Sequence, residues 1–214
     1  FPLIFSFHPK LKFYKEWKFV FPALLITAAF FIIWDYFFTK WDVWNFNPKY
    51  LIGIYIAGMP VEEWMFFIFI PFSCIFIYHC LNIFFEKDRS VKFTKLINWC
   101  LLLILILAML FCYNKMYTFT TAFFLFLYLL WLMIKKANPT GKFYRAYLVS
   151  QIPFLVVNGV LTSLPVVIYN NNENLGTRIY AIPAEDFFYS LLMLLMNISL
   201  MEFFKRKQNI QKVV

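Results

Sequence analysis

Two segments of the sequence repeat each other at a distance of 123 residues, and each places two acidic residues at the head of a long apolar run. The first segment is Pro60–Phe67, with the sequence PVEEWMFF, and the second is Pro183–Ser190, with the sequence PAEDFFYS. The same distance relates Asn47 to Asn170. A register that is kept without gaps over such a span predicts a fold built from two copies of one structural unit.

The composition is typical of a polytopic membrane protein. Hydrophobic residues make up 63% of the chain and charged residues 14%, whereas soluble domains are about one half apolar and about one quarter charged. The net charge is +9, but the basic residues lie in loops between apolar runs, where they set the orientation of a membrane protein. This distribution predicts a lipid bilayer as the partner and argues against nucleic acid.

The apolar runs predict an all-α protein with about seven transmembrane helices, the first of them truncated. A spanning helix needs about 20 residues, so we interpret the short stretch Phe1–Phe7 as the end of a first helix. The other six helices are expected near residues 17–37, 60–85, 96–113, 116–134, 143–169 and 182–204. Residues 53–59 should form a bend or broken turn before the third helix.

The repeat groups these helices into two parallel three-helix units, residues 1–90 and residues 116–214. The helix within residues 91–115 has no counterpart in the repeat, so we interpret it as a linker helix that faces lipid. Basic residues concentrate in alternate loops and in the tail from Lys205 onward. The positive-inside rule then predicts a multi-pass protein of the cell membrane with a cytoplasmic C-terminus. Both acidic segments should open on the opposite side, at equal depth.

Four carboxyl side chains within apolar sequence need an explanation, and we predict that they are catalytic: Glu62, Glu63, Glu185 and Asp186. A charged residue at the bilayer centre costs roughly 2.5–3.5 kcal/mol on insertion scales and usually marks function. Alternatively, the acids only cap helix N-termini, but capping does not explain why each of the two helix starts carries two acids. Carboxyls gathered in a dry site do not all ionise, so one keeps a proton and acts as general acid while the others stabilise a cation.

Helix geometry indicates which side chains accompany the acids. Successive residues of a helix point about 100° apart, so one acid of each pair should face the centre. Glu63 shares a helix face with Phe66 and Phe67, and Asp186 shares one with Tyr189. Aromatic faces attract cations and would suit a transient carbocation. The alternative for each ring is a core or lipid-facing position, since 30 of the 214 residues are Phe.

The acidic segments and their surroundings resemble the integral-membrane lycopene cyclases, a family of two homologous subunits that are often fused into one chain. The resemblance rests on both PxE(E/D) segments, on Trp34-Asp35, on Phe46-Asn47 and on the run from Asn158 to Ser190. It covers nearly the whole chain. It implies that the linear ends of lycopene are cyclised to ionone-type rings without redox change and without a cofactor. We expect β rings, as in β-carotene or γ-carotene.

The resemblance also implies that the acids of both halves are needed, which carries over to the four carboxyl residues above. The substrate would be lycopene or a related linear carotenoid, and relatives of the family act on longer carotenoids. Substrate contacts are expected from the residues of the matching motifs and of the two aromatic helix faces: Trp34, Asp35, Asn47, Phe66, Phe67, Asn158, Asn170 and Tyr189.

A small transporter built from two parallel three-helix repeats and a linker helix is the main alternative. A sugar path would need more polar residues within the helices than Asn158, Thr162, Ser163 and Asn197. A retinal protein is disfavoured because the last predicted helix has no Lys before Lys205 to form a Schiff base.

The sequence has no GxGxxG or P-loop, and its four cysteines lie in apolar runs without CxxC spacing, so we expect no dinucleotide and no metal.

Overall fold

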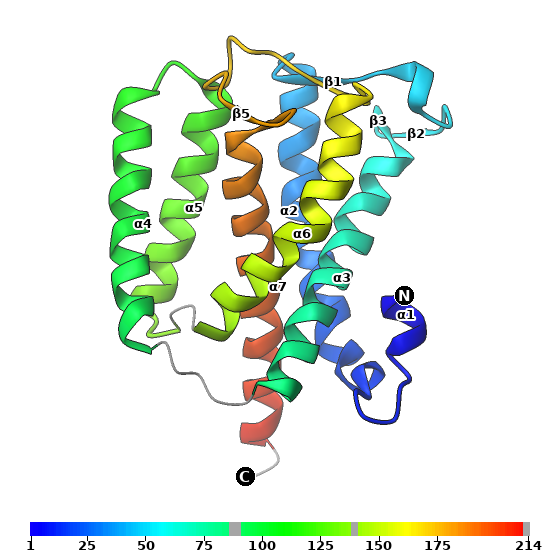
Figure 1. Ribbon diagram of the computed structural model, residues 1–214, viewed down its shortest axis with the longest axis vertical. Helices are drawn as coiled ribbons and strands as arrows, with labels where there is room; N and C mark the ends of the chain where they lie inside the picture. The colour runs from blue at the N-terminus through cyan, green and yellow to red at the C-terminus, as the bar shows by residue number, and fades with distance from the viewer. Residues whose placement is uncertain (86–90, 138–140, 212–214) are drawn as a thin grey trace.

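The computed structural model describes residues 1–85, 91–137 and 141–211. Six long helices run side by side along its long axis (Figure 1), and each is long and apolar enough to cross a membrane. They are α2 (Trp17–Lys40), α3 (Val61–Phe84), α4 (Val91–Phe111), α5 (Met116–Ile134), α6 (Gly141–Ser163) and α7 (Ala184–Gln211). The prediction of an all-α polytopic membrane fold is confirmed. The N-terminal stretch that was predicted to end a first helix holds the four-residue α1 (Pro2–Phe5), and η1 (Phe13–Glu16) leads into α2.

Helix boundaries depart from the predicted ones where proline stops a helix or polar residues prolong it. The prediction that the sixth helix reaches residue 169 was wrong, because α6 ends at Ser163. Pro165 disfavours a helical conformation at the residue before it and has no N–H to donate. Conversely, α2 runs on to Lys40 and α7 to Gln211, and α4 begins at Val91. Lys, Arg and Gln favour helix beyond the apolar run.

Short antiparallel strand pairs close one end of the molecule, which we call the strand end (Figure 1). They are β1 (Trp44–Phe46) with β4 (Val167–Tyr169), β2 (Tyr55–Ile56) with β3 (Met59–Pro60), and β5 (Arg178–Ile179) with β6 (Ile182–Pro183). The short helix η2 (Pro48–Tyr50) follows β1. The bend expected at residues 53–59 is therefore a hairpin. Its turn residues Ala57 and Gly58 both have positive φ, +50° and +80°, as a type I′ turn requires.

The two halves of the chain make equivalent contacts with each other. The backbone N–H of Asn47 donates to the carbonyl of Val166 at 2.9 Å, and the N–H of Asn170 donates to the carbonyl of Val43 at the same distance. Donors and acceptors of the two bonds are related by the 123-residue repeat. The halves are therefore joined reciprocally at β1 and β4, as in a complex with two-fold symmetry.

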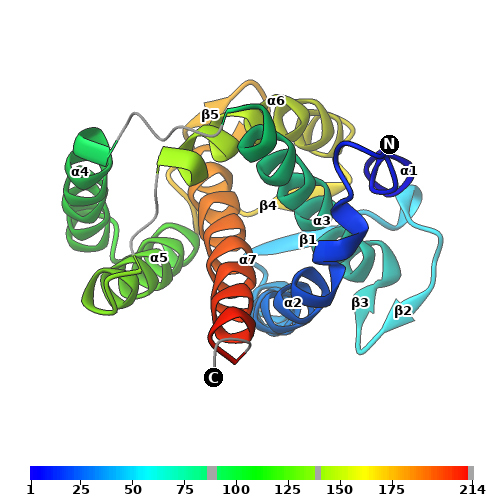
Figure 2. The same cartoon turned by 90° about the horizontal axis from the view of Figure 1, so that it is seen from below.

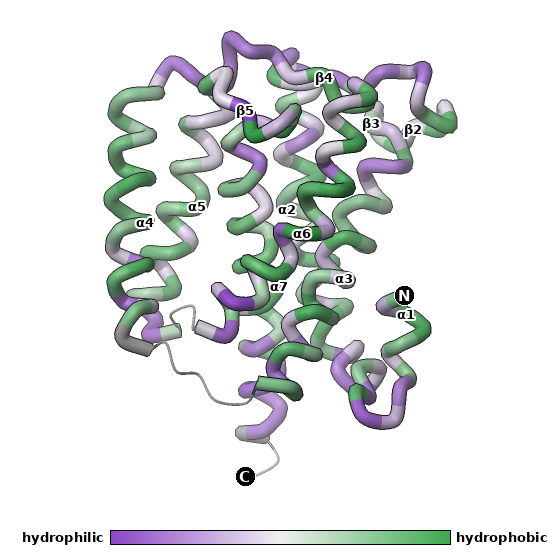
Figure 3. The backbone as a smooth tube through the Cα atoms, in the orientation of Figure 1, coloured by the Kyte–Doolittle hydropathy of each residue, from purple (hydrophilic) through white to green (hydrophobic). Residues whose placement is uncertain are grey.

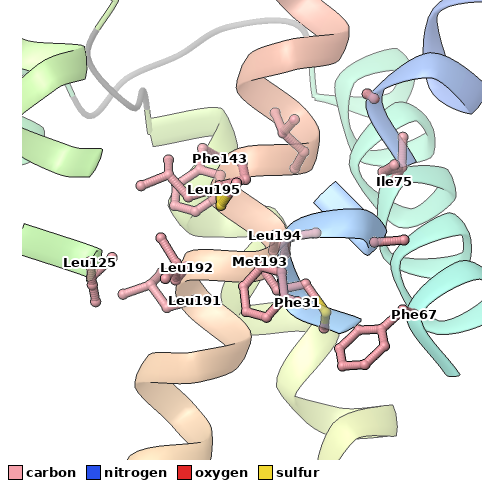
Figure 4. Close-up of a cluster of buried hydrophobic side chains, with 14 of the residues drawn as sticks. Phe31, Phe67, Ile75, Leu125, Phe143, Leu191, Leu192, Met193, Leu194 and Leu195 are labelled. Atoms are coloured by element: carbon pink, nitrogen blue, oxygen red, sulfur yellow. The ribbon is translucent and has the colours of Figure 1, made fainter. Parts of the chain in front are cut away.

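Helix α7 is the centre of the bundle and contacts α2, α3, α5 and α6 (Figure 2). Its five consecutive residues Leu191–Leu195 are all buried, with side chains on every side of the helix (Figure 4). A helix that is apolar all round is expected to be surrounded by others. Contacts between α2 and α7 and between α3 and α6 cross from one half of the chain to the other.

Helix α4 lies at the edge of the bundle and packs against α5 (Figure 2). Asn98, Leu102 and Leu105 on one face of α4 are buried, whereas Trp99 and Leu103 are exposed. Cys100 is also exposed, while Cys74, Cys80 and Cys112 are half-buried; all four are free. The position of α4 at the edge explains these exposed side chains, because only one face of an edge helix has a protein neighbour.

Hydrophobic residues cover the length of the helices, and hydrophilic residues gather at both ends (Figure 3). The end opposite the strands, which we call the basic end, holds the start of α2 and the end of α7 (Figure 1). There the Lys205 ammonium pairs with the Glu16 carboxylate at 2.8 Å. The described basic residues of this end are Lys10, Lys12, Lys15, Lys18, Lys95, Lys135, Lys136, Lys142, Arg145, Lys205, Arg206 and Lys207.

Candidate active site

A narrow cavity lies between α3, α6 and α7 and reaches the strand end. Its volume is about 130 Å³, below the roughly 300–1,000 Å³ of pockets that enclose a drug-sized ligand. Lining side chains follow α3 from Glu63 to Ile77 and α6 from Tyr147 to Leu161, a length of about 20 Å at the helical rise of 1.5 Å per residue. The cavity therefore suits one end of a long, thin, apolar molecule.

The acidic segments place two carboxyl groups at the start of α3 and two at the start of α7. Pro60 precedes α3 with an extended backbone, where its missing N–H costs nothing. Both acids of each segment fall in the first helical turn, where the helix dipole favours negative charge. Because neighbouring helical residues point about 100° apart, the two acids of each pair have different surroundings.

The first acid of each pair accepts a hydrogen bond from the loop before its helix. The Ile52 N–H donates to Glu62 Oε1 at 2.6 Å, and the Leu175 N–H donates to Glu185 Oε1 at 2.7 Å. These bonds are again equivalent under the repeat. Glu185 also accepts a bond of 2.6 Å from the Thr118 hydroxyl of α5. Glu62 and Glu185 thus hold the loops that precede α3 and α7.

The second acid of each pair, Glu63 or Asp186, lines the cavity. Asp186 is buried and accepts three hydrogen bonds: Tyr117 Oη donates to Oδ1 at 2.6 Å, Asn158 Nδ2 to Oδ2 at 3.0 Å and Tyr169 Oη to Oδ2 at 2.9 Å. Burial, and then the neighbouring Asp186 carboxylate, raise the pKa of Tyr169 above its ordinary value. The Tyr169 phenol therefore keeps its proton and serves as a donor.

Glu63 meets a different partner, the carboxyl of Asp35 on α2. The two side chains are in hydrogen-bonding contact with each other, and both line the cavity. Asp35 is buried and accepts a bond of 2.8 Å from the Tyr189 hydroxyl of α7. Three elements of both halves therefore meet at this carboxyl pair.

Aromatic rings surround the three cavity carboxyls. The ring of Trp44 lies 5.0 Å from that of Tyr117, and the ring of Tyr117 stacks on Tyr169 at 6.1 Å between centroids. Phe46 and Phe66 complete this wall. Such rings present negative faces that stabilise cations.

Six of the twelve predicted site residues line the cavity: Asp35, Glu63, Phe66, Asn158, Asp186 and Tyr189. Trp34 lies behind them, with its ring 5.1 Å from that of Tyr189, and Phe67 stacks on Phe31 in the core. Asn47 and Asn170 hold loops instead: Asn47 Oδ1 accepts the Lys49 N–H, and Asn170 Nδ2 donates to the Asp42 carbonyl.

Six aromatic residues that line the cavity were not among the predicted site residues: Trp44, Phe46, Tyr117, Tyr147, Phe154 and Tyr169. For Phe46 and Tyr169 a signal existed, since they precede Asn47 and Asn170 in the repeated pairs. Strand alternation points neighbours to opposite faces, so the aromatic residue and not the Asn faces inward. Tyr117 lies outside the two acidic segments, and the packing of α5 against α7 brings it to Asp186.

The model of the lycopene cyclase family matches residues 1–81 and 114–204. The two matched segments lie on either side of α4 and include every carboxyl of the cavity. The chain is a member of the lycopene cyclase family. No curated protein and no solved structure matches it. Membership in the lycopene cyclase family identifies an enzyme of carotenoid cyclisation that works in a membrane on a carotenoid substrate.

Proposed function

We propose that this lycopene cyclase converts the linear ends of lycopene to ionone-type rings of the β type by acid catalysis, without a cofactor. The observation that carries the proposal is the placement of Asp35, Glu63 and Asp186 at one end of a long apolar cavity with aromatic walls. A polyene end that enters along α3 and α6 would meet these carboxyls with its terminal alkene. The remaining chain would stay in the apolar part of the cavity and in lipid.

The proposed reaction needs only proton transfers. A carboxylic acid protonates the terminal alkene and leaves a tertiary carbocation. The π electrons of the next alkene in reach attack this cation, which forms the carbon–carbon bond of a six-membered ring and moves the charge to a ring carbon. A carboxylate then removes a neighbouring proton, and the choice of proton fixes a β, ε or γ ring. Protons gained and lost balance, so no oxidant or reductant is needed.

In this proposal Glu63 and Asp186 act on the substrate, while Glu62 and Glu185 hold the loops before α3 and α7 in place. Asp35, Asn158 and Tyr189 support the acids, and the ring of Phe66 faces the cation. Trp34 and Phe67 pack behind the residues that line the cavity. Asn47 and Asn170 hold loops in place. Acid–base groups contribute about 10²–10⁴-fold to a rate, and electrostatic stabilisers a similar factor.

We further propose that residues 1–90 and 116–214 are the two repeats, that residues 91–115 supply the linker helix, and that the basic end faces the cytoplasm. The equivalent hydrogen bonds of the halves support the first part. The gathering of basic residues at one end supports the orientation, because Lys and Arg accumulate on the cytoplasmic side of membrane proteins.

The test is expression in cells that accumulate lycopene, followed by chromatography and mass spectrometry of the pigments. The wild-type chain should convert lycopene to a product of equal mass with one or two β rings. Product formed in heavy water should carry one deuterium per ring, because the acid exchanges with solvent before it protonates the alkene. Asp42→Asn is the matched control: it changes an exposed loop acid whose φ of +56° suits Asn. Unchanged lycopene with folded wild-type protein would refute the proposal, and ε or γ rings would refute the β assignment.

A further inference from the structure

The carboxyls at the head of the cavity fall into two groups that differ in their hydrogen-bond donors. Asp186 accepts three bonds, from the phenols of Tyr117 and Tyr169 and from the amide of Asn158. Asp35 and Glu63 contact each other, and Asp35 accepts a bond of 2.8 Å from the Tyr189 hydroxyl. One carboxyl is thus surrounded by donors, whereas the other two face one another.

This difference follows from substitutions between the two repeats. At the repeat distance of 123 residues, Glu63 corresponds to Asp186, Asp35 to Asn158 and Phe46 to Tyr169. The first repeat therefore has a carboxyl where the second has an amide donor, and a phenyl ring where the second has a phenol. The cavity is symmetric in backbone but asymmetric in the groups that contact its acids.

Each arrangement favours a different protonation state. Two carboxyls in contact at a dry site repel each other when both are ionised, so the pair retains one proton. A carboxylate that accepts several hydrogen bonds is stabilised in its charged form. The guanidinium of Arg178, whose centre lies 5.8 Å from the centroid of the Tyr169 ring, adds positive charge on the side of Asp186. Glu62 and Glu185 occupy equivalent positions in the two repeats and each accepts a bond from a loop N–H, so these bonds do not distinguish the two sides.

We propose that the two repeats divide the chemistry: the Asp35–Glu63 pair stores the proton and donates it to the alkene, while the ionised Asp186 stabilises the carbocation and accepts the proton that is lost. The proposal rests on the proposed cyclisation and specifies which half of the site is acid and which is base. After ring closure the proton on Asp186 returns to the pair, so each cycle ends with the groups as they began. Asp35 is thereby a functional partner of Glu63, and Tyr117, Asn158 and Tyr169 are positioning residues for Asp186.

The test is infrared spectroscopy of the purified protein in lipid at neutral pH, without substrate. A protonated carboxyl has a carbonyl stretching band that moves to lower frequency in heavy water. We expect such a band in the wild type, its loss or shift in Asp35→Asn and in Glu63→Gln, and an unchanged band in Asp186→Asn. Absence of the band from the wild type, a change in Asp186→Asn, or no change in the two pair variants would overturn the proposal.

A second variant guards against misfolding of the single mutants. Tyr117→Phe combined with Tyr169→Phe keeps both rings but removes two donors from Asp186, so a second carbonyl band should appear as Asp186 gains a proton. Tyr128→Phe is the control, because its hydroxyl pairs with Ser199 outside the cavity. A double variant with the wild-type spectrum would contradict the assignment of Asp186 as the ionised group.

The spectra separate this proposal from the proposed function, because they need no turnover. If the wild type leaves lycopene unchanged but shows the expected bands, the cyclisation proposal fails and the protonation pattern stands. If it cyclises lycopene but its band belongs to Asp186, the function stands and the division between the repeats is overturned.

Discussion

Asn45 and Ile168 lie opposite each other in the antiparallel pair of β1 and β4, and the same 123 residues separate them as separate the two acidic segments. The strand pairing is therefore centred on a pair of equivalent residues. An antiparallel pair with such a centre relates its two strands by a two-fold rotation. Because α3 and α7 both begin at this end, the rotation axis runs along the helices, and it brings Glu63 and Asp186 to the same cavity from opposite halves.

The two acids of each segment should differ in the effect of their loss. Glu63→Gln and Asp186→Asn remove carboxyls from the cavity. Both variants should insert into the membrane like the wild type, but their cyclisation rate should fall by about 10²–10⁴-fold. Glu62→Gln and Glu185→Gln weaken one loop bond each and should cost about 1 kcal/mol of stability, with a smaller loss of product. Product per membrane-inserted protein and thermal unfolding in detergent measure the two effects. Equal losses in all four variants would contradict the separation.

The donors around Asp186 should matter for activity. Tyr117→Phe or Tyr169→Phe removes one bond to a buried carboxylate, and such bonds contribute about 1.5–3 kcal/mol. Cyclisation should therefore fall by roughly ten- to a hundredfold in each. Rate measurements at saturating and limiting lycopene would show a loss in turnover rather than in binding. Wild-type turnover in both variants would show that these phenols do not act on the reaction.

The loop before α7 should depend on the backbone conformation of Gly176, whose φ is +72°. Gly176→Ala forces a side chain into the left-handed region, at a cost of about 1–2 kcal/mol, and should loosen the adjacent N–H of Leu175 from Glu185. Gly176→Asn should restore part of the stability, since Asn tolerates this conformation. Gly159→Ala is the control: it lies within α6 with no heavy atom within 4 Å of the added Cβ, and should not lower the melting temperature. A Gly176→Ala protein as stable as the wild type would refute this account.

The orientation of the bundle is open to a direct measurement. Because the described basic residues concentrate at the basic end, a reporter fused after residue 214 should lie in the cytoplasm. A fluorescent protein that matures only in the cytoplasm should be bright there, and a phosphatase that works only outside should be inactive. The same pair of reporters inserted between Ala57 and Gly58, at the turn of the β2–β3 hairpin, should give the reverse result. An active phosphatase at the C-terminus would reverse the orientation.

The sequence by itself determined the membrane class and the position of the helices. Each apolar run is a local feature of the sequence, and the bilayer thickness sets its length. The bounds of α3 and α5 were therefore predicted to within a residue at each end. The repeat of Pro60–Phe67 in Pro183–Ser190 is likewise visible without a structure, and it predicted that acids of both halves belong to the site. The hairpins and the end of α6 depend on local turn chemistry, which hydropathy does not reveal.

Only the tertiary structure decided which groups meet. Glu62 and Glu63 are adjacent in sequence and identical in chemistry, yet one binds the Ile52 N–H and the other lines the cavity. Asp35 and Glu63 come from different helices, and Tyr117 reaches Asp186 from α5, far from both acidic segments in the sequence. Hydrogen bonds act over about 3 Å, whereas a repeat or a hydropathy pattern carries no information about distances between helices. The partners of each carboxyl, and with them its protonation, are therefore properties of the packed bundle.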